Sequence, residues 1–376
     1  MGKAKRSYTA DHGVRSLNPS SPSPARRAAL AVDALRHGWP LRFLNEGGEA
    51  ITLLPVETAI ATDATSGNML ISAARAATLK LANQIEAAVP HAPVLIRGGD
   101  PFSLSEALPI ADPALDLRHP FKGPFRAEAL DWADTAQAAL ELARIAGILP
   151  AFLVDPDQGG EAQELLAGDV EARADTGLLK IASRARLPVH ATEEAELVAF
   201  RSTEDMREHV ALVIGRNEGS GTPLVRLHSE CLTGDVLGSL KCDCGPQLDA
   251  ALHAMAEEAK KGGWGVLLYM RQEGRGIGLI NKMRAYSLQD QGFDTVEANQ
   301  RLGLPDEARD FPVAARMLGL LGVDTIRLMT NNPAKVDALE NAGVSVAERV
   351  QHQLPDNPFN ARYLATKRDK SGHLLK

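Results

Sequence analysis

All three cysteines of this 376-residue chain lie within fourteen positions of one another. Cys231, Cys242 and Cys244 belong to the stretch HSECLTGDVLGSLKCDCGP, residues 228–246. Two cysteines two positions apart on an extended segment point the same way, and the glycines before them allow the chain to bring Cys231 alongside. Thiolates are soft ligands that suit zinc. The spacing therefore predicts that the three sulfurs bind one metal ion.

The number of ligands in this predicted site indicates its role. Structural zinc sites are closed by four protein ligands, whereas catalytic sites keep one position open for a water whose pKa falls toward about 7. Three thiols therefore favour a catalytic centre. Three alternatives remain: His228 completes a structural site, the cysteines form a redox dithiol, or they are free buried thiols. The redox alternative is weakened because C-x-C lacks the usual C-x-x-C spacing at a helix start.

Composition argues against several classes of protein. The formal net charge of −7 argues against a general nucleic-acid binder. The sequence has no run of eighteen apolar residues, and no apolar stretch of signal-peptide length follows its basic N-terminus. An odd number of cysteines makes a disulfide framework unexpected. We therefore expect a cytoplasmic protein without membrane or nucleic-acid partners.

The length of the chain and its order of helix-like and strand-like segments predict an N-terminal tail followed by two domains of the α/β (α+β) class. Residues 1–24 are basic and rich in Ser and Pro, which is typical of a disordered arm. Residues 25–184 form the first predicted domain and residues 185–376 the second. In the first, periodicity predicts helices over 25–38, 66–85, 127–148 and 163–168, strands over 41–44, 50–56 and 150–154, and an irregular segment over 99–126.

The second predicted domain has strands that alternate with helices after an antiparallel start. The expected strands cover 187–200, 209–215, 223–229, 264–270 and 325–330, and the expected helices cover 247–261, 279–292 and 313–322. The segment RNEGSGT at 216–222 is typical of a hairpin connection, so the strands on either side of it are expected to pair.

Two turns in this domain have the features of anion sites. The loop RQEGRGIG at 271–278 joins a strand to a helix, and TNNPAK at 330–335 starts another helix with an asparagine cap followed by proline. Either turn is equally consistent with a purely structural role. Lys282 and Tyr286 share one helix face, and DEARD at 306–310 offers acid–base groups beside a guanidinium. With an activated water, these features predict hydrolysis of a nucleotide-like substrate.

Three long stretches resemble the GTP cyclohydrolase II family: RLHSECLTGDVLGSLKCDCGPQL, YMRQEGRGIGLINKMRAYSLQDQGFDTVEAN and LMTNNPAK. They occur in the family order, and the similarity runs from about Ala185 to the C-terminus. The resemblance implies the first committed enzyme of riboflavin biosynthesis, which opens the imidazole ring of GTP and releases formate and pyrophosphate. It also implies one zinc ion on the three cysteines, magnesium with the GTP phosphates, and a homodimer.

The resemblance further implies roles for individual residues. Tyr286 matches a tyrosine at the reacting ring, and Arg309 matches an arginine assigned as nucleophile toward the α-phosphate, for which electrostatic stabilisation is the physically favoured role. The family pattern D-E-R-D is replaced by DEARD, so the proton acceptor is expected at Glu307, with Asp306 as the alternative. The implied zinc ligands are Cys231, Cys242 and Cys244, and the implied GTP contacts are Arg226, Leu227, His228, Ser229, Glu230, Gln247, Glu273, Gly274, Arg275, Thr295, Thr330 and Lys335.

The first domain resembles dihydroxybutanone phosphate synthase over residues 31–58 and 138–154. That family binds magnesium through a cluster D-R-E-N-E-G-D, which is reduced here to NEGGE at 45–49, and its H-T-E triplet is replaced by DWADTAQ. We therefore expect a degenerate, non-catalytic domain. Three alternative functions stay open: a related enzyme that opens another ring, as in pyrimidine catabolism; a zinc-stabilised nucleic-acid or regulatory module; and a bifunctional enzyme.

Overall fold

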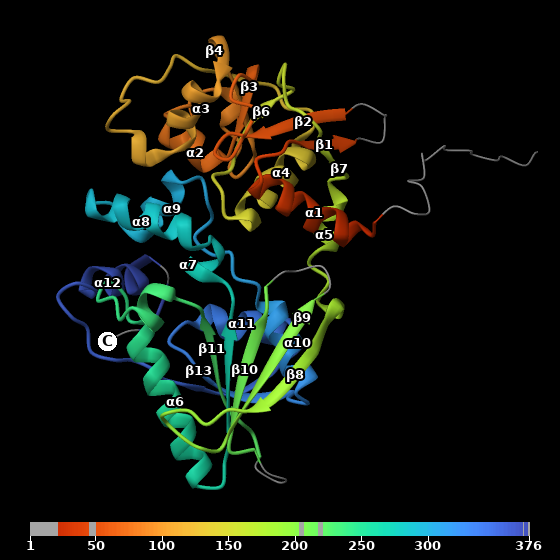
Figure 1. The fold of residues 1–376 in the computed structure, drawn as a ribbon. Coiled ribbons are helices and arrows are strands. Elements are labelled where there is room, and N and C mark those ends of the chain that lie inside the picture. Colours follow the sequence, from red (N-terminus) through yellow and green to blue (C-terminus); the bar gives the residue numbers. More distant parts are fainter. Residues whose placement is uncertain (1–21, 45–49, 203–206, 217–220, 371, 375–376) are drawn as a thin grey trace, which may run out of the picture.

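The structure, a computed structural model, describes residues 22–44, 50–202, 207–216, 221–370 and 372–374. The predictions for most of the basic arm and for NEGGE at 45–49 lie outside the described residues. The described chain contains two seven-stranded sheets, one from each half of the sequence, with helices packed around them (Figure 1). This arrangement confirms the predicted mixed α/β class. None of the helices in the described ranges combines the length and apolar character needed to cross a bilayer.

The first sheet is largely antiparallel, with the strand order β5-β4-β3-β6-β2-β1-β7. Its strands are β1 (Leu41–Leu44), β2 (Ala50–Pro55), β3 (Thr65–Ile71), β4 (Val94–Ser103), β5 (Arg126–Glu128), β6 (Ala151–Val154) and β7 (Gln163–Leu165). The helices of this half are α1 (Pro24–Arg36), α2 (Ala73–Thr78), α3 (Leu104–Ala111), α4 (Ala133–Ala146) and α5 (Gly168–Ala172), with short 3₁₀ turns η1 (Ile85–Ala87), η2 (Pro113–Leu115) and η3 (Thr176–Leu178). The α1 helix forms as the sequence predicts, because the Ser23 side chain accepts a hydrogen bond from the Arg26 amide at 3.3 Å.

The second sheet has the order β14-β13-β11-β12-β10-β9-β8, and its strands are parallel from β12 to β14. These strands are β8 (Leu179–Arg186), β9 (Ala195–Ser202), β10 (His209–Ile214), β11 (Leu224–Ser229), β12 (Gly265–Met270), β13 (Thr325–Met329) and β14 (Ser345–Val350). The helices of this half are the π-helical turn η4 (Leu232–Val236), α6 (Cys244–Lys260), α7 (Glu273–Gly276), α8 (Leu279–Asp290), α9 (Thr295–Arg301), α10 (Phe311–Leu320), α11 (Pro333–Asn341) and α12 (Ala361–Lys370).

Three element predictions in the first half are wrong. Residues 66–85 contain the strand β3 and the short helix α2 instead of one helix, because a short buried apolar run has the same pattern in either state. Residues 163–168, expected as a helix, contribute β7, which gains backbone partners by pairing with β1. The segment 99–126, expected to be irregular, includes the end of β4 and the α3 helix, which a Ser103–Glu106 capping box starts.

At the start of the second half, the expected domain boundary falls inside a strand, and one pairing prediction is wrong. The β8 strand pairs with β9, so the second sheet begins at Leu179, before the expected division at 184/185. The strands that flank 216–222 do not form a hairpin, because β10 and β11 lie on opposite sides of β12.

The two halves meet at the helices that follow β12. In Figure 1, α7, α8 and α9 lie between the two sheets, against the first half. One buried apolar cluster joins first-half residues such as Leu54 and Ile71 to side chains of the second half. The second-half members of this cluster are Ile277, Ala285, Leu288, Ala298, Leu302 and Leu304. The chain that connects β12 to β13 therefore packs on both halves.

Candidate active site

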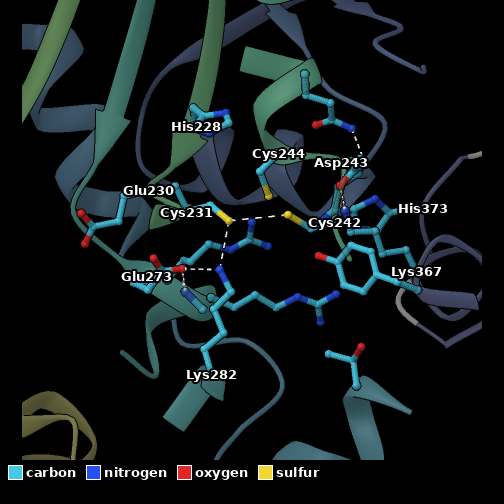
Figure 2. Close-up of a pocket in the computed structure, with 18 of the residues that line it drawn as sticks. His228, Glu230, Cys231, Cys242, Asp243, Cys244, Glu273, Lys282, Lys367 and His373 are labelled. Atoms are coloured by element: carbon cyan, nitrogen blue, oxygen red, sulfur yellow. Dashed lines mark hydrogen bonds and ion pairs between the residues drawn. The ribbon is translucent and has the colours of Figure 1, made fainter. Parts of the chain in front are cut away.

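A pocket lies where the parallel strands β11, β12 and β13 end, which is the edge where open α/β sheets bind ligands (Figure 2). Its walls come from the loops after these strands, from α6, α8 and α9, and from the C-terminal segment that contains α12. The lining residues that the sequence analysis named are Arg226, Leu227, His228, Ser229, Glu230, Cys231, Cys242, Cys244, Gln247, Glu273, Gly274, Arg275, Lys282, Tyr286, Thr295, Arg309, Thr330 and Lys335. The fold thus brings together residues that are more than a hundred positions apart in the sequence.

The three cysteine sulfurs converge in this pocket (Figure 2). They lie within 4.8 Å of one another, and the Sγ atoms of Cys231 and Cys242 are 3.7 Å apart. The local geometry differs from the prediction, because Cys244 is the first residue of α6 and not part of an extended segment. Gly234 packs tightly on the sulfurs, and a Cβ atom there would lie 2.8 Å from Cys242 Sγ. Three convergent thiols fit a zinc ion.

A buried ion pair adjoins one of the thiols. Lys282 Nζ lies 2.9 Å from Cys231 Sγ and 2.8 Å from Glu273 Oε1. Hydrogen bonds from Cys242 first, and then from Cys244 and Lys282, lower the pKa of Cys231 below its usual range. Burial alone would lower the pKa of Lys282, but its hydrogen bonds with Cys231 and Glu273 raise it above the usual value. Lys282 therefore links the cysteine loop to the loop after β12.

The histidine considered as a fourth metal ligand is held elsewhere. His228 Nε2 lies 3.1 Å from both carboxylate oxygens of Asp235, and the His228 ring stacks on Tyr269 at 5.6 Å. The Tyr269 hydroxyl donates to Asp235 at 2.9 Å, and the Cys231 amide donates to the same carboxylate at 3.0 Å. Figure 2 shows His228 apart from the sulfurs. His228 thus orders the cysteine loop through Asp235 rather than joining the sulfurs.

Basic side chains crowd another part of the pocket. They are Arg226, Arg275, Arg309, Lys335 and Lys367. Burial lowers the pKa of Arg226 to about 10. Burial, with repulsion from Arg309 and Arg226, lowers the pKa of Lys335 well below its usual value. These cations repel one another and so lower one another's pKa. A bound polyanion would relieve this repulsion, so this part of the pocket favours a polyanion.

The two carboxylates expected as proton acceptors stand outside the lining of the pocket. Glu307 forms an ion pair with Arg309, which does line it. Burial alone would raise the pKa of Glu307, but the contact with Arg309 lowers it. Burial raises the pKa of Asp306, whose Oδ1 has no hydrogen-bond partner among the described residues. Glu307 therefore acts on the pocket through Arg309.

The sequence analysis missed the C-terminal part of the site. Lys367 on α12 contacts Asp243 Oδ1 at 2.8 Å and lies over the Tyr363 ring at 4.3 Å. The chain then turns back, and His373 joins the lining of the pocket. No motif marks this segment in the sequence. The one signal in the sequence was the position of Asp243 between two cysteines, because a carboxylate beside a buried metal site needs a partner of opposite charge.

Fold and pocket together define an α/β enzyme in which a thiol-lined centre adjoins an anion-binding region. The family model described as GTP cyclohydrolase II matches residues 180–351. A protein of Azospirillum brasilense named GTP cyclohydrolase-2 is 39% identical over 398 residues, which cover 97% of this chain and 100% of that protein. The chain therefore belongs to the GTP cyclohydrolase II family.

Other relatives match shorter parts of the chain. A GTP cyclohydrolase-2 of Escherichia fergusonii is 54% identical over 197 residues, which are 52% of this chain and 97% of that protein. The Riboflavin biosynthesis protein RibBA of Salinispora arenicola is 47% identical over 258 residues, which are 64% of this chain and 60% of that protein. A solved structure of RibBX, a two-domain 3,4-dihydroxy-2-butanone 4-phosphate synthase from A. baumannii, covers 85% of this chain and 99% of that one at 18% identity. Its TM-score of 0.28 is too low to support an argument about this fold.

Proposed function

We propose that this member of the GTP cyclohydrolase II family uses zinc to convert GTP into a diaminopyrimidinone ribosyl phosphate, formate and pyrophosphate, at the first committed step of riboflavin biosynthesis. One observation carries the proposal: three convergent sulfurs and six lysine and arginine side chains share one pocket. The thiols suit zinc, and the crowded cations suit a triphosphate. Magnesium accompanies the phosphates in this proposal.

The residues around the sulfurs prepare the site for attack on the purine. A zinc ion on Cys231, Cys242 and Cys244 would supply Lewis acidity, which makes water nucleophilic at neutral pH. Lys282 favours the thiolate form of Cys231 through its contact at 2.9 Å. Burial raises the pKa of Tyr286, so its hydroxyl stays protonated and is able to donate a hydrogen bond to the reacting base.

The residues at the cationic end bind and activate the phosphates. Arg226, Lys335 and Lys367 neutralise the triphosphate, and Arg309 stabilises the transferring phosphoryl group. Glu307 holds Arg309 in place and is the proposed proton acceptor, with Asp306 as its alternative. The other proposed GTP contacts are Leu227, His228, Ser229, Glu230, Gln247, Glu273, Gly274, Arg275, Thr295 and Thr330.

The remaining expectations are proposals about the whole protein. The first half of the chain, up to the start of β8 at Leu179, is proposed as a degenerate, non-catalytic dihydroxybutanone phosphate synthase-like domain, and the second half as the catalytic domain. A homodimer is supported by exposed apolar side chains on the cysteine loop, at Leu232, Val236, Leu237 and Leu240. The cytoplasmic location and the lack of nucleic-acid and membrane partners stay predictions.

Formate release tests the proposal directly. The purified full chain, given GTP and magnesium, is expected to release formate, a zinc chelator is expected to stop the release, and added zinc is expected to restore it. Cys242→Ser is expected to lose both bound zinc and formate release, because two sulfurs hold the metal less well than three. A wild-type protein that binds zinc but leaves GTP intact would refute the proposal. A panel of other nucleotides and bases then shows whether a different ring is opened.

A further inference from the structure

The loop after β12 has an unusual backbone. Gly274 has φ 63° and ψ 36°, and Arg275 has φ 62° and ψ 28°, so both are left-handed. Gly276 and Gly278 also have positive φ, at 91° and 86°. A left-handed conformation is unfavourable for an L-residue such as arginine, because its Cβ atom crowds the following carbonyl oxygen. Such a backbone persists where its surroundings hold it, and Glu273, Gly274 and Arg275 all line the pocket.

Part of that support comes from the first half of the chain. Arg144 on α4 donates a hydrogen bond from Nη1 to the Gly276 carbonyl at 2.9 Å. Glu141, one turn earlier on α4, accepts from Arg144 Nε at 2.7 Å and fixes the direction of the guanidinium. On the other side of the loop, a Cβ atom on Gly276 would lie 2.3 Å from the Ala308 carbonyl oxygen. The loop is thus held between α4 and the segment that carries Arg309.

A second connection reaches the next carbonyl of the loop. Glu57, which follows β2 in the first half, accepts two hydrogen bonds from Arg284 on α8, at 3.2 and 2.9 Å. Arg284 also donates to Asn281 Oδ1 at 2.9 Å, and the fully buried Asn281 donates to the Ile277 carbonyl at 3.1 Å. Glu57 itself is fixed by the Leu149 amide at 2.6 Å. Two successive carbonyls of the loop, at 276 and 277, are therefore tied to the first half.

The pocket side of the same loop is tied to the cysteine loop. Glu273 Oε2 accepts a hydrogen bond from the Leu232 amide at 2.7 Å, directly after Cys231. The loop therefore has one end on the metal-binding segment and the other on the first half of the chain. A shift of the carbonyls at 276 and 277 moves Gly274 and Arg275 relative to the sulfurs.

We propose that Arg144 and Glu57 are positioning residues, and that the first half of the chain serves to hold the loop 273–278 in the shape that places Arg275 against the substrate. The inference rests on the proposed function, because it assigns the first half a part in binding GTP. Neither residue touches the pocket, so both act through the loop backbone.

The experiment compares three variants of the full chain with the wild type. Arg144→Ala removes the donor to Gly276, and Arg144→Lys keeps a cationic donor there. Arg36→Ala is the matched control, because Arg36 donates to the Ala146 and Ile145 carbonyls at 3.2 and 3.4 Å within the first half. Initial rates of formate release are measured over a range of GTP concentrations, and amide hydrogen exchange is measured over 273–278.

We expect Arg144→Ala to raise KM for GTP about tenfold, since a hydrogen bond from a charged donor is lost. The change in kcat is expected to stay within about threefold, because the sulfurs and Tyr286 do not depend on Arg144. Loop amides are expected to exchange faster, Arg144→Lys is expected to restore most of the affinity, and Arg36→Ala is expected to change neither quantity.

The inference is overturned if Arg144→Ala and Arg36→Ala have equal effects on KM, or if Arg144→Ala lowers thermal stability with KM and loop exchange unchanged. Glu57→Gln provides an independent check, because it weakens the connection to Ile277 without touching Arg144. An unchanged KM in Glu57→Gln would overturn the role proposed for Glu57. An inactive wild type, in contrast, would refute the proposed function itself, so the two failures are distinguishable.

Discussion

Glu307 and Asp306 are neighbours in the sequence but have different surroundings. Glu307 pairs with Arg309 at the pocket, whereas Asp306 is half-buried and its inaccessible Oδ1 has no partner among the described residues. We expect Glu307→Gln to lower kcat by at least about tenfold, because it releases Arg309 and removes the carboxylate. Asp306→Asn is expected to stay within about threefold of the wild type. Formate and pyrophosphate release measure both, and the reverse order of effects would assign the acceptor to Asp306.

We expect Lys335 to make the binding of GTP depend on pH. Its pKa is lowered well below the usual value, by burial first and then by Arg309 and Arg226, so Lys335 loses its charge at a lower pH than an ordinary lysine does. A bound polyanion favours the charged form and raises this pKa. Binding is therefore expected to take up protons, and affinity is expected to weaken as pH rises through the lowered pKa.

Calorimetry of GTP binding to the Cys242→Ser variant measures this proton uptake. The binding heat is compared at one pH in two buffers of different ionisation enthalpy, because protons that are taken up come from the buffer. Lys335→Met in the same background is expected to take up fewer protons. Binding heats that are equal in both buffers would contradict the expectation.

The α12 helix brings a cation to the site from the end of the sequence. Lys367 lies between Asp243 and Tyr363, with 12% of its side chain exposed, whereas Arg368 pairs with Asp369 at the surface. We expect Lys367→Met to raise KM for GTP about tenfold, because a phosphate partner is lost and Asp243 is left without its cation. Arg368→Ala on the same helix is the control and is expected to leave KM unchanged. Equal KM values for the two variants would remove α12 from the binding site.

Helices and strands of this protein were predictable where the signal lies within the segment itself and the segment is long enough to show a pattern. The α11 helix begins at the expected asparagine and proline, and Asn332 Oδ1 accepts from the Ala334 amide at 3.1 Å. The β7 strand was missed because three residues carry too little pattern, and pairing with β1 decides their state. The hairpin predicted at 216–222 failed because β12, which begins only at Gly265, takes the place between β10 and β11.

The two halves of the molecule share one buried apolar cluster, so we expect them to unfold together. Trp39 and Trp132 report on the first half and Trp264 on the second. In a Trp264→Phe variant, fluorescence reports on the first half alone, whereas circular dichroism reports on the whole chain. The unfolding midpoints measured on this variant by the two methods are therefore expected to agree. Two separate transitions, with the first half melting alone, would show that the shared cluster contributes little to cooperativity.

The candidate site could be predicted from the sequence because its chemistry is concentrated in short segments. The cysteine positions, the turn after β12 and the start of α11 each contain the residue types that metal and phosphate binding require. The pocket also contains all the residues that the family resemblance named as zinc ligands and GTP contacts. Lys367 and His373 could not be found in this way, since ordinary residues become part of a site only through contacts between distant elements.

The sequence by itself determined the ligand chemistry: three thiols with spacing that allows them to meet, and turns that present backbone N–H groups and cations. Tertiary structure decided which partners these groups have. It turned His228 toward Asp235, placed Lys282 beside Cys231, and set Arg144 against the loop that carries Arg275. The physical reason is that ligand type is a property of each side chain, whereas burial, pairing and backbone support depend on segments that meet when the chain packs.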